Sequence, residues 1–271
     1  MLLSALLAIG DVDAADKVAA IISVQDGLTV PNQSVDIAAK LTTKGVLNQG
    51  LGGEPLELLI NGQLVGTAMT GGDGKARFSY TPKAQGTVRI HVRVGSSPRV
   101  APVEGQGNLL IWERRNPILA VEMAALMETP PSQVPLPGFD LLMASAAVPM
   151  PDAATELGKL TQFYYHVIYV VPSGSDGFHA SVQARDWLEA HKFPTGYVLI
   201  LPSGEPAVGE TIDALHADGW KTVKTGIGRS KAFAEAFVQR RLEAVIVPEP
   251  SGDRPRKAKI AKSWKEIRKR L

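Results

Sequence analysis

The sequence predicts two folded parts, an all-β sandwich followed by a three-layer, Rossmann-like α/β domain with a mainly parallel sheet. The chain has 271 residues, more than the roughly 100–200 residues of one ordinary domain. Hydrophobic residues make up 45% of it and charged residues 21%, so each part can bury a core. The hydrophobic pattern also changes its period near residue 115. We therefore expect domains at 17–115 and 116–271.

The first part is predicted to consist of short strands without helices. Apolar or alternating runs, separated by Gly, Pro, Asn and Asp, occur at residues 18–24, 34–41, 55–60, 76–80, 87–94 and 108–112. Asn61-Gly62 predicts a two-residue hairpin, because both central positions of a type I′ turn need a positive φ. Many short strands within about 95 residues are typical of a β-sandwich.

The second part alternates strands with helices. Continuous apolar runs, typical of strands covered on both faces, occur at residues 118–122, 166–171, 197–201, 221–225 and 243–247. Helical patterns lie between or after them at residues 154–164, 180–192, 209–219 and 230–241. Such alternation predicts a parallel sheet. The segment 129–151 holds six prolines and one charge, and we expect it to form an extended flap over the sheet edge.

Part of the first domain resembles a known family. Residues 55–92 contain an Asp-Gly-Lys-Ala turn, which leads into a predicted strand with aromatic residues and then into a Tyr-Thr-Pro corner. In these features the segment resembles bacterial immunoglobulin-like domains. The resemblance implies a fold and no reaction.

The second domain resembles the haloacid-dehalogenase-like phosphatases, most nearly their lipin and phosphatidate-phosphatase branch. The resemblance lies in residues 117–130, 163–200 and 220–247, and its most specific run is W-L-x-x-H-x-F-P-x-G-x-x-L-I from Trp187. It implies an α/β fold with a phosphate site at the carboxyl ends of the strands.

The motifs that carry the family's chemistry are altered in this chain. The resemblance implies an Asp-x-Asp pair after the first strand, and the matching positions are Glu122 and Ala124. A hydroxyl residue is implied after the second strand, where Val171 stands, with Ser173 two residues beyond. A phosphate-neutralising lysine is implied later, and Lys224 is the candidate. Together with Arg229 and Phe233, these residues would form a vestigial phosphatase pocket.

The acidic turn that holds magnesium in these enzymes is also altered. Arg229 and Phe233 stand where the resemblance implies carboxylates. Magnesium needs hard oxygen ligands, usually one or two carboxylates with substrate phosphate. One glutamate, Glu122, beside an arginine does not supply that set, so we predict no catalytic residue, no metal and no cofactor. Glu122 is alternatively a structural carboxylate paired with a neighbouring Arg or Lys.

A second candidate site follows the fourth strand. Residues 226–231 have the sequence Gly-Ile-Gly-Arg-Ser-Lys, and backbone N–H groups at a helix start can bind an anion. We name Gly228, Arg229, Ser230 and Lys231 as the anion-binding candidates. The alternative is an ordinary strand-to-helix turn in which Ser230 caps the helix.

Other catalytic classes lack their residues. The chain has no cysteine, which excludes thiolate nucleophiles and thiolate metal sites. Its five histidines show no paired zinc spacing. No apolar run reaches the ~20 residues of a membrane-spanning helix.

The carboxyl-terminal segment 254–271 is strongly basic. It holds nine Lys or Arg against Glu266, whereas the rest of the chain has twenty Lys or Arg against twenty-six Asp or Glu. Ile260, Trp264, Ile267 and Leu271 recur at helical spacing. Three interpretations compete for this predicted helix: packing on its own domain, contact with anionic lipid, and contact with nucleic acid. The apolar stripe favours packing, and nucleic acid is the least favoured partner.

Residues 1–14 leave the location of the protein open. The apolar run and the small residues Val12-Asp13-Ala14 fit a secretion signal, but no Lys or Arg precedes the run. The balance slightly favours the cytoplasm over export.

These observations predict a catalytically inactive, phosphatase-like binding or scaffold protein with a protein partner. One alternative is a metal-dependent phosphatase for phosphomonoesters such as phosphatidate, with Glu122 as nucleophile. Another is a peripheral protein that binds anionic lipid through residues 254–271.

Overall fold

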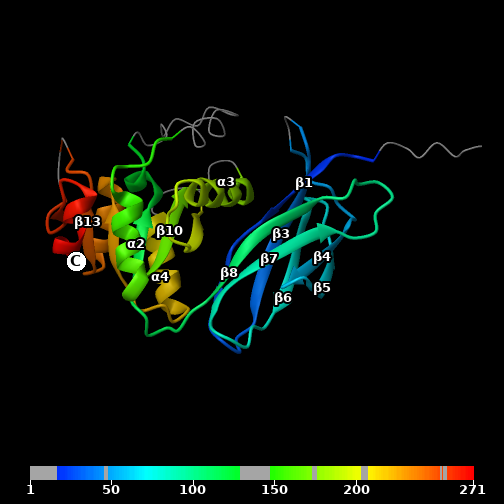
Figure 1. Cartoon of the computed structure of the whole chain (residues 1–271), viewed down its shortest axis with the longest axis horizontal. Helices are drawn as coiled ribbons and strands as arrows, with labels where there is room; N and C mark the ends of the chain where they lie inside the picture. The colour runs from blue at the N-terminus through cyan, green and yellow to red at the C-terminus, as the bar shows by residue number, and fades with distance from the viewer. Residues whose placement is uncertain are drawn as a thin grey trace, which may run out of the picture.

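The strand-rich and helix-containing parts lie side by side along the long axis of the molecule (Figure 1). The computed structural model describes residues 17–45, 48–128, 147–172, 176–202, 207–250, 252 and 255–271. Most of the predicted flap and the candidate signal segment fall outside these ranges, as does Ser173.

The amino-terminal part contains two sheets. One has the strand order β1 (Ala20–Val24), β3 (Val35–Thr43) and β6 (Lys75–Tyr80). The other has the order β2 (Gly27–Thr29), β8 (Glu104–Ile111), β7 (Gly86–Val94), β4 (Pro55–Ile60) and β5 (Gln63–Met69). All neighbouring strands are antiparallel except the pair β2 and β8. Buried side chains of both sheets, such as Ile37 and Leu56, share one core, which confirms a sandwich.

The hairpin between β4 and β5 confirms the turn predicted from sequence. Asn61 has φ 50° and Gly62 has φ 75°, both in the left-handed region that a type I′ turn requires. Ile60 pairs with Gln63 across the turn. The short turn therefore sets the register of this strand pair.

The second part is built on a six-stranded sheet in which every neighbouring pair is parallel. Its strand order is β11 (Tyr197–Leu201), β10 (His166–Pro172), β9 (Ile118–Glu122), β12 (Val223–Gly228), β13 (Glu243–Ile246) and β14 (Lys259–Ile260). The five predicted strands are confirmed, and β14 is an additional edge strand. The order places β9, the first strand of this sheet, at its centre.

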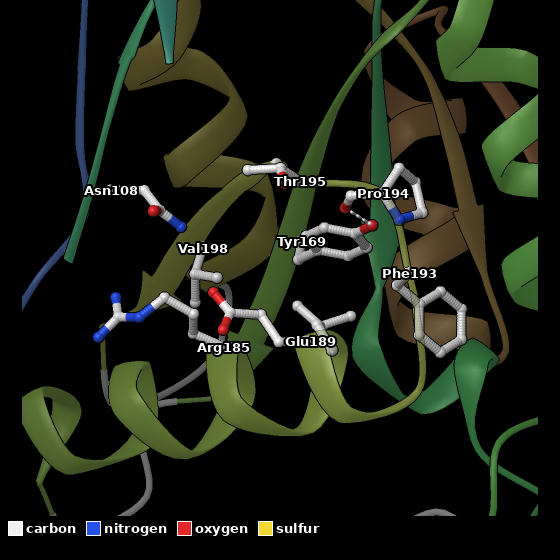
Figure 2. A pocket seen from close by; sticks show the side chains of 10 residues that line it. Asn108, Tyr169, Arg185, Glu189, Phe193, Pro194, Thr195 and Val198 are labelled. Atoms are coloured by element: carbon white, nitrogen blue, oxygen red, sulfur yellow. Dashed lines mark hydrogen bonds between the residues drawn. The ribbon is translucent and has the colours of Figure 1, made fainter. Parts of the chain in front are cut away.

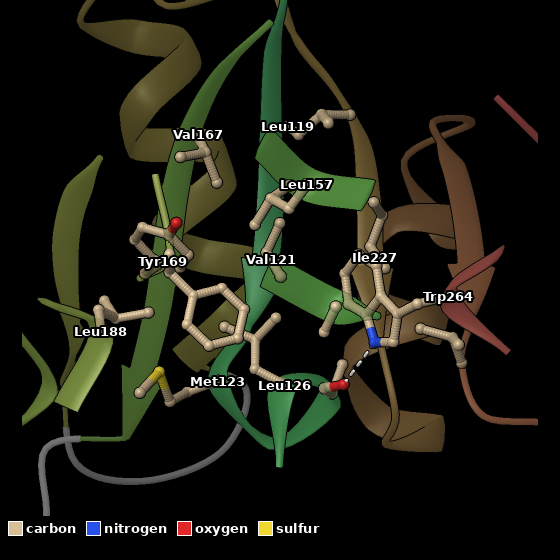
Figure 3. Packing of buried hydrophobic residues seen from close by; sticks show 14 of the residues in the cluster. Leu119, Val121, Met123, Leu126, Leu157, Val167, Tyr169, Leu188, Ile227 and Trp264 are labelled. Carbon is tan, nitrogen blue, oxygen red and sulfur yellow. Dashed lines mark hydrogen bonds between the residues drawn. The ribbon is translucent and has the colours of Figure 1, made fainter. Parts of the chain in front are cut away.

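Side chains of β9 alternate between two cores, one on each face of the sheet. Leu119 and Val121 belong to a core that contains residues of α2 (Ala153–Phe163) and α3 (Gly177–Ala190) (Figure 3). Ile118 and Ala120 belong to the other core, with residues of α4 (Ala207–Ala217) and α5 (Lys231–Gln239). Helices thus cover both faces, as the continuous apolar strands predict.

The basic tail differs from the single helix predicted for it. Ile260 lies in β14, and the helical residues are only a 3₁₀ turn η2 (Trp264–Glu266) and the short helix α6 (Ile267–Arg270). Trp264 and Ile267 are fully buried, and Trp264 Nε1 donates to the Ala125 carbonyl at 3.0 Å. The apolar stripe therefore packs on its own domain, because these side chains complete the core beside α2.

An apolar seam joins the two parts. Leu110 and Trp112, at the end of the sandwich, belong to the same core as the strands and helices of the α/β part. The Trp112 ring stacks on His166 at 4.4 Å between centroids and meets Trp220 edge-on at 6.4 Å. The boundary at residue 115 stays a prediction, since buried side chains on both sides of it share one core.

A buried ion pair crosses the same junction. Arg185 of α3 pairs with Asp26, which lies between β1 and β2, and their side chains are 5% and 0% exposed. Arg185 also donates to the carbonyls of Gln106 at 2.6 Å and Val24 at 3.3 Å. Burial raises the pKa of Asp26, and the Arg185 guanidinium acts against that rise. The pair is satisfied only when both parts meet, and separation of the parts would leave each side chain without this partner.

Candidate functional site

The candidate site is the rim formed by the carboxyl ends of β9 and β12. In a parallel α/β sheet, ligands bind outside the carboxyl ends of the strands, at the point where the strand order reverses. Here the chain runs outward from β9 to β10 and β11, and then returns to β12 on the other side of β9. Glu122 ends β9, and Gly228 ends β12 directly before α5.

The carboxylate of Glu122 accepts three hydrogen bonds from groups at this rim. Its Oε2 accepts hydrogen bonds from the backbone N–H groups of Arg229 at 2.6 Å and Ser230 at 2.8 Å. Its Oε1 accepts a third from the Ser230 hydroxyl at 2.6 Å. These donors form the amino-terminal end of α5, where the helix favours negative charge. Glu122 therefore occupies the position that an external anion would take.

Ser230 has two functions in this arrangement. Its hydroxyl oxygen accepts from Phe233 N at 3.2 Å, which is the N-cap bond predicted from sequence. The same hydroxyl donates to Glu122. The N-cap bond belongs to the turn interpretation, and the N–H groups of Arg229 and Ser230 donate to a side chain of the protein itself. Binding of an external anion at this turn stays a prediction.

Arg229 and Phe233, at which the phosphatase resemblance implied carboxylates, make contacts within the protein. Arg229 Nη1 donates to the carbonyls of Met127 at 2.8 Å and Glu128 at 2.9 Å, so its side chain holds the segment that follows β9. Phe233 is 1% exposed and packs on Phe237 with 5.1 Å between ring centroids. Neither side chain offers an oxygen to a cation.

Three further predicted residues occupy different places. Val171 lies at the carboxyl end of β10, one residue beyond the partner of Glu122 in register, and its side chain is buried in the apolar core. Ala124 lies in the 3₁₀ turn η1 (Met123–Leu126) that follows Glu122. Ser173 lies outside the described residues.

Lys224 does not lie at the rim. Lys224 is exposed at the amino end of β12, four residues or about 13 Å of strand from Gly228. The expectation that Lys224 steadies a phosphate is therefore corrected, because Lys224 lies near the amino end of β12 and the rim lies at the carboxyl end. Lys231 lies 3.7 Å from Glu235 in the next turn of α5.

Sequence reasoning missed a second concentration of polar groups, at the junction around Arg185. A cavity there, lined by Asn108, Tyr169, Arg185 and Val198 among others, has a volume of about 20 Å³ (Figure 2), room for roughly one water molecule. A neighbouring groove of about 310 Å³ has Arg89, Glu104 and Asp186 in its lining. Asp26 and Arg185 are 159 positions apart, and no local signal in the sequence links them.

Two kinds of feature are absent from the described ranges. No group of three or more His, Cys, Asp or Glu in them is arranged to hold a metal ion. No helix in them has the length and apolar character needed to cross a membrane.

Comparisons with known proteins found likeness only in structure. No family model matches the chain, and no curated protein matches it. The fibronectin(III)-like modules of Clostridium thermocellum CbhA match with a TM-score of 0.26 and 11% identity over 35% of this chain, which spans 47% of theirs. The D00-D0 domain of intimin matches with a TM-score of 0.28 and 16% identity, over 40% of this chain and 52% of that one.

A phosphatase is among the structures similar to this chain. D,D-heptose 1,7-bisphosphate phosphatase from Burkholderia thailandensis matches with a TM-score of 0.39 and 10% identity, over 56% of this chain and 96% of that one. Immunoglobulin-like or fibronectin-like domains and a phosphatase thus appear among its neighbours, all at low TM-scores.

Proposed function

We infer that the protein is a non-catalytic binding or scaffold protein, with an immunoglobulin-like sandwich and an α/β domain of the haloacid-dehalogenase-like type whose phosphatase chemistry has been lost. The single observation that carries this proposal is the engagement of Glu122 in three hydrogen bonds with the start of α5. A nucleophile has to approach its target in line at roughly 3–3.5 Å, and a carboxylate whose two oxygens are both engaged is held away from that geometry.

The charges around Glu122 support the same proposal. Arg229 holds the carbonyls of Met127 and Glu128, and the neutral ring of Phe233 fills the space beneath Gly228. A phosphoryl-transfer site concentrates metal ions and cations around the transferred group. The groups at this rim instead satisfy one another.

The junction supports a scaffold role for the whole chain. The buried pair of Asp26 and Arg185 lies beside a seam of apolar side chains. Lys40 of β3 adds a second bridge, 2.8 Å from Asp176 at the start of α3. Ion pairs and apolar contacts together hold the sandwich and the α/β part in one mutual orientation. A scaffold protein needs such an orientation to present both parts to its partners.

Phosphate release from p-nitrophenyl phosphate and from phosphatidate, with millimolar magnesium, tests the loss of catalysis. The purified full chain is expected to release no phosphate above the rate without protein. Glu122→Gln removes the carboxylate that ends β9, and Glu128→Gln, which removes an exposed carboxylate nearby, is the matched control. Magnesium-dependent release that Glu122→Gln abolishes and Glu128→Gln leaves intact would refute the proposal.

Binding of inorganic phosphate tests the internal carboxylate. The unmodified protein is expected to show no rise in melting temperature with millimolar phosphate, because Glu122 already occupies the donors. Glu122→Ala exposes the N–H groups of Arg229 and Ser230, so phosphate should then stabilise the protein. Equal stabilisation of both proteins would show that phosphate binds elsewhere.

A further inference from the structure

The two most exposed large hydrophobic side chains among the described residues are neighbours at the end of α2. Phe163 is 83% exposed and Tyr164 is 64% exposed. Tyr164 meets Tyr165 edge-on, with 4.7 Å between ring centroids, so the pair is not simply a frayed end. Large aromatic side chains gain free energy when they leave water, and here no described element covers them.

The basic tail runs beside α2 toward these aromatic residues. Lys265 lies 3.4 Å from Asp152, and Arg268 lies 2.9 Å from Glu156. From Lys265 to Arg268 in the tail, the paired residue on the other segment moves from Asp152 to Glu156. The tail and α2 therefore run in the same direction. The carboxyl terminus lies beside α2 at the end of the molecule opposite the sandwich (Figure 1).

Helical spacing places a cation and an aromatic side chain on this same stripe of α2. Asp152, Glu156, Lys159 and Phe163 fall on one face of the helix, at offsets of four, seven and eleven residues. Lys159 lies 2.7 Å from Glu156, which Arg268 also contacts. Two cations thus share one carboxylate, and Phe163 follows one turn later.

We call this region the α2–tail surface. It comprises the aromatic pair and the exposed cations Lys159, Lys262, Lys265, Arg268, Lys269 and Arg270. The carboxylates within it are Asp152, Glu156 and Glu266, so it has an excess of three positive charges. Outside residues 254–271 the chain has six more acidic than basic residues. The positive charge is therefore concentrated at one end of the molecule.

We propose that the α2–tail surface docks the protein on anionic lipid bilayers, with Phe163 and Tyr164 entering the interfacial region and the cations facing the headgroups. Charge complementarity identifies this occupant, since basic residues are drawn to an anionic bilayer surface. Aromatic rings with an apolar body and, in Tyr164, a polar tip favour the interface. The tail's own apolar face stays in the core through Trp264 and Ile267, so α2 supplies the anchor and the tail supplies charge.

Sedimentation with vesicles tests this docking. The full chain is expected to sediment with phosphatidylcholine vesicles that contain about one third phosphatidylserine, and not with phosphatidylcholine alone. Raising the salt from about 0.1 M to about 1 M should release it, because the Debye length falls from about 10 Å to about 3 Å.

Two pairs of variants separate the anchor from the charge. Phe163→Ser with Tyr164→Ser should weaken binding about tenfold or more, whereas Met69→Ser, an exposed apolar residue of β5, should change nothing. Lys262→Gln with Lys269→Gln should weaken binding about fivefold for each charge removed. The matched control for charge is Arg77→Gln with Lys83→Gln on the sandwich, where both side chains are exposed.

Fluorescence gives a second readout that does not depend on losing function. The four tryptophans of the chain are all buried, so Phe163→Trp adds one exposed indole. Its emission should shift to the blue, and acrylamide should quench it less, when anionic vesicles are added. Failure of the full chain to sediment, or no spectral shift, would overturn the proposal. Patch variants that lose single-stranded RNA binding, in a protein that never binds vesicles, would assign the surface to nucleic acid instead.

Discussion

Removal of the guanidinium that joins the two parts should destabilise the whole molecule. Arg185→Met keeps most of the side-chain volume but breaks the contacts with Asp26, Val24 and Gln106. Asp26 then loses its charged partner at 0% side-chain exposure and is left with two backbone N–H donors. Breaking a buried pair in this way costs about 3–5 kcal/mol. We therefore expect the free energy of unfolding in urea, followed by far-UV circular dichroism, to fall by that amount.

A matched variant at the same junction separates burial from charge. Arg89 lies 2.9 Å from Glu189 of α3, but these side chains are 44% and 50% exposed. Arg89→Met should therefore cost no more than about 1 kcal/mol. Adding Asp26→Asn to Arg185→Met should restore part of the loss, because the buried carboxyl that has lost its partner is gone. If Arg185→Met and Arg89→Met destabilise the protein equally, the buried pair does not hold the junction.

Three other predictions concern the α/β part. Trp264→Ala empties a fully buried position and should lower the free energy of unfolding by about 3–5 kcal/mol in a urea titration. Gly228→Ala places a Cβ against the ring of Phe233 and should cost about 1–3 kcal/mol; an unchanged melting temperature would contradict this packing. The hydrogen bond from Lys159 lowers the pKa of Glu156 below its ordinary value of 4.5. The ionised Glu156 carboxylate therefore contributes to stability above pH 4.5, and this contribution should be lost as the pH falls through the lowered pKa. In Glu156→Gln the free energy of unfolding should change less with pH over this range.

Local patterns in the sequence predicted much of the architecture. Alternation of side chains, continuous apolar runs and helical spacing each report which faces of a segment are buried, so strands and helices could be placed from them. Asn61-Gly62 predicted its hairpin because the required backbone conformation is a property of the two residues alone. The same reasoning failed for the tail, where Ile260 fits a helical period but pairs with β13 as a strand. A short apolar pattern does not distinguish an edge strand from a helix turn.

The sequence by itself thus determined a strand-rich part, an alternating α/β part and the residue types at the rim. Only the tertiary structure decided how those residues are used: Glu122 binds the start of α5, 107 positions away, and Lys224 lies at the far end of its strand. It also decided that Asp26 meets Arg185 and that the basic tail pairs with Asp152 and Glu156 of the segment that Phe163 ends. The physical reason is that burial periodicity is encoded locally, whereas hydrogen bonds and ion pairs between distant segments depend on how strands and helices pack together.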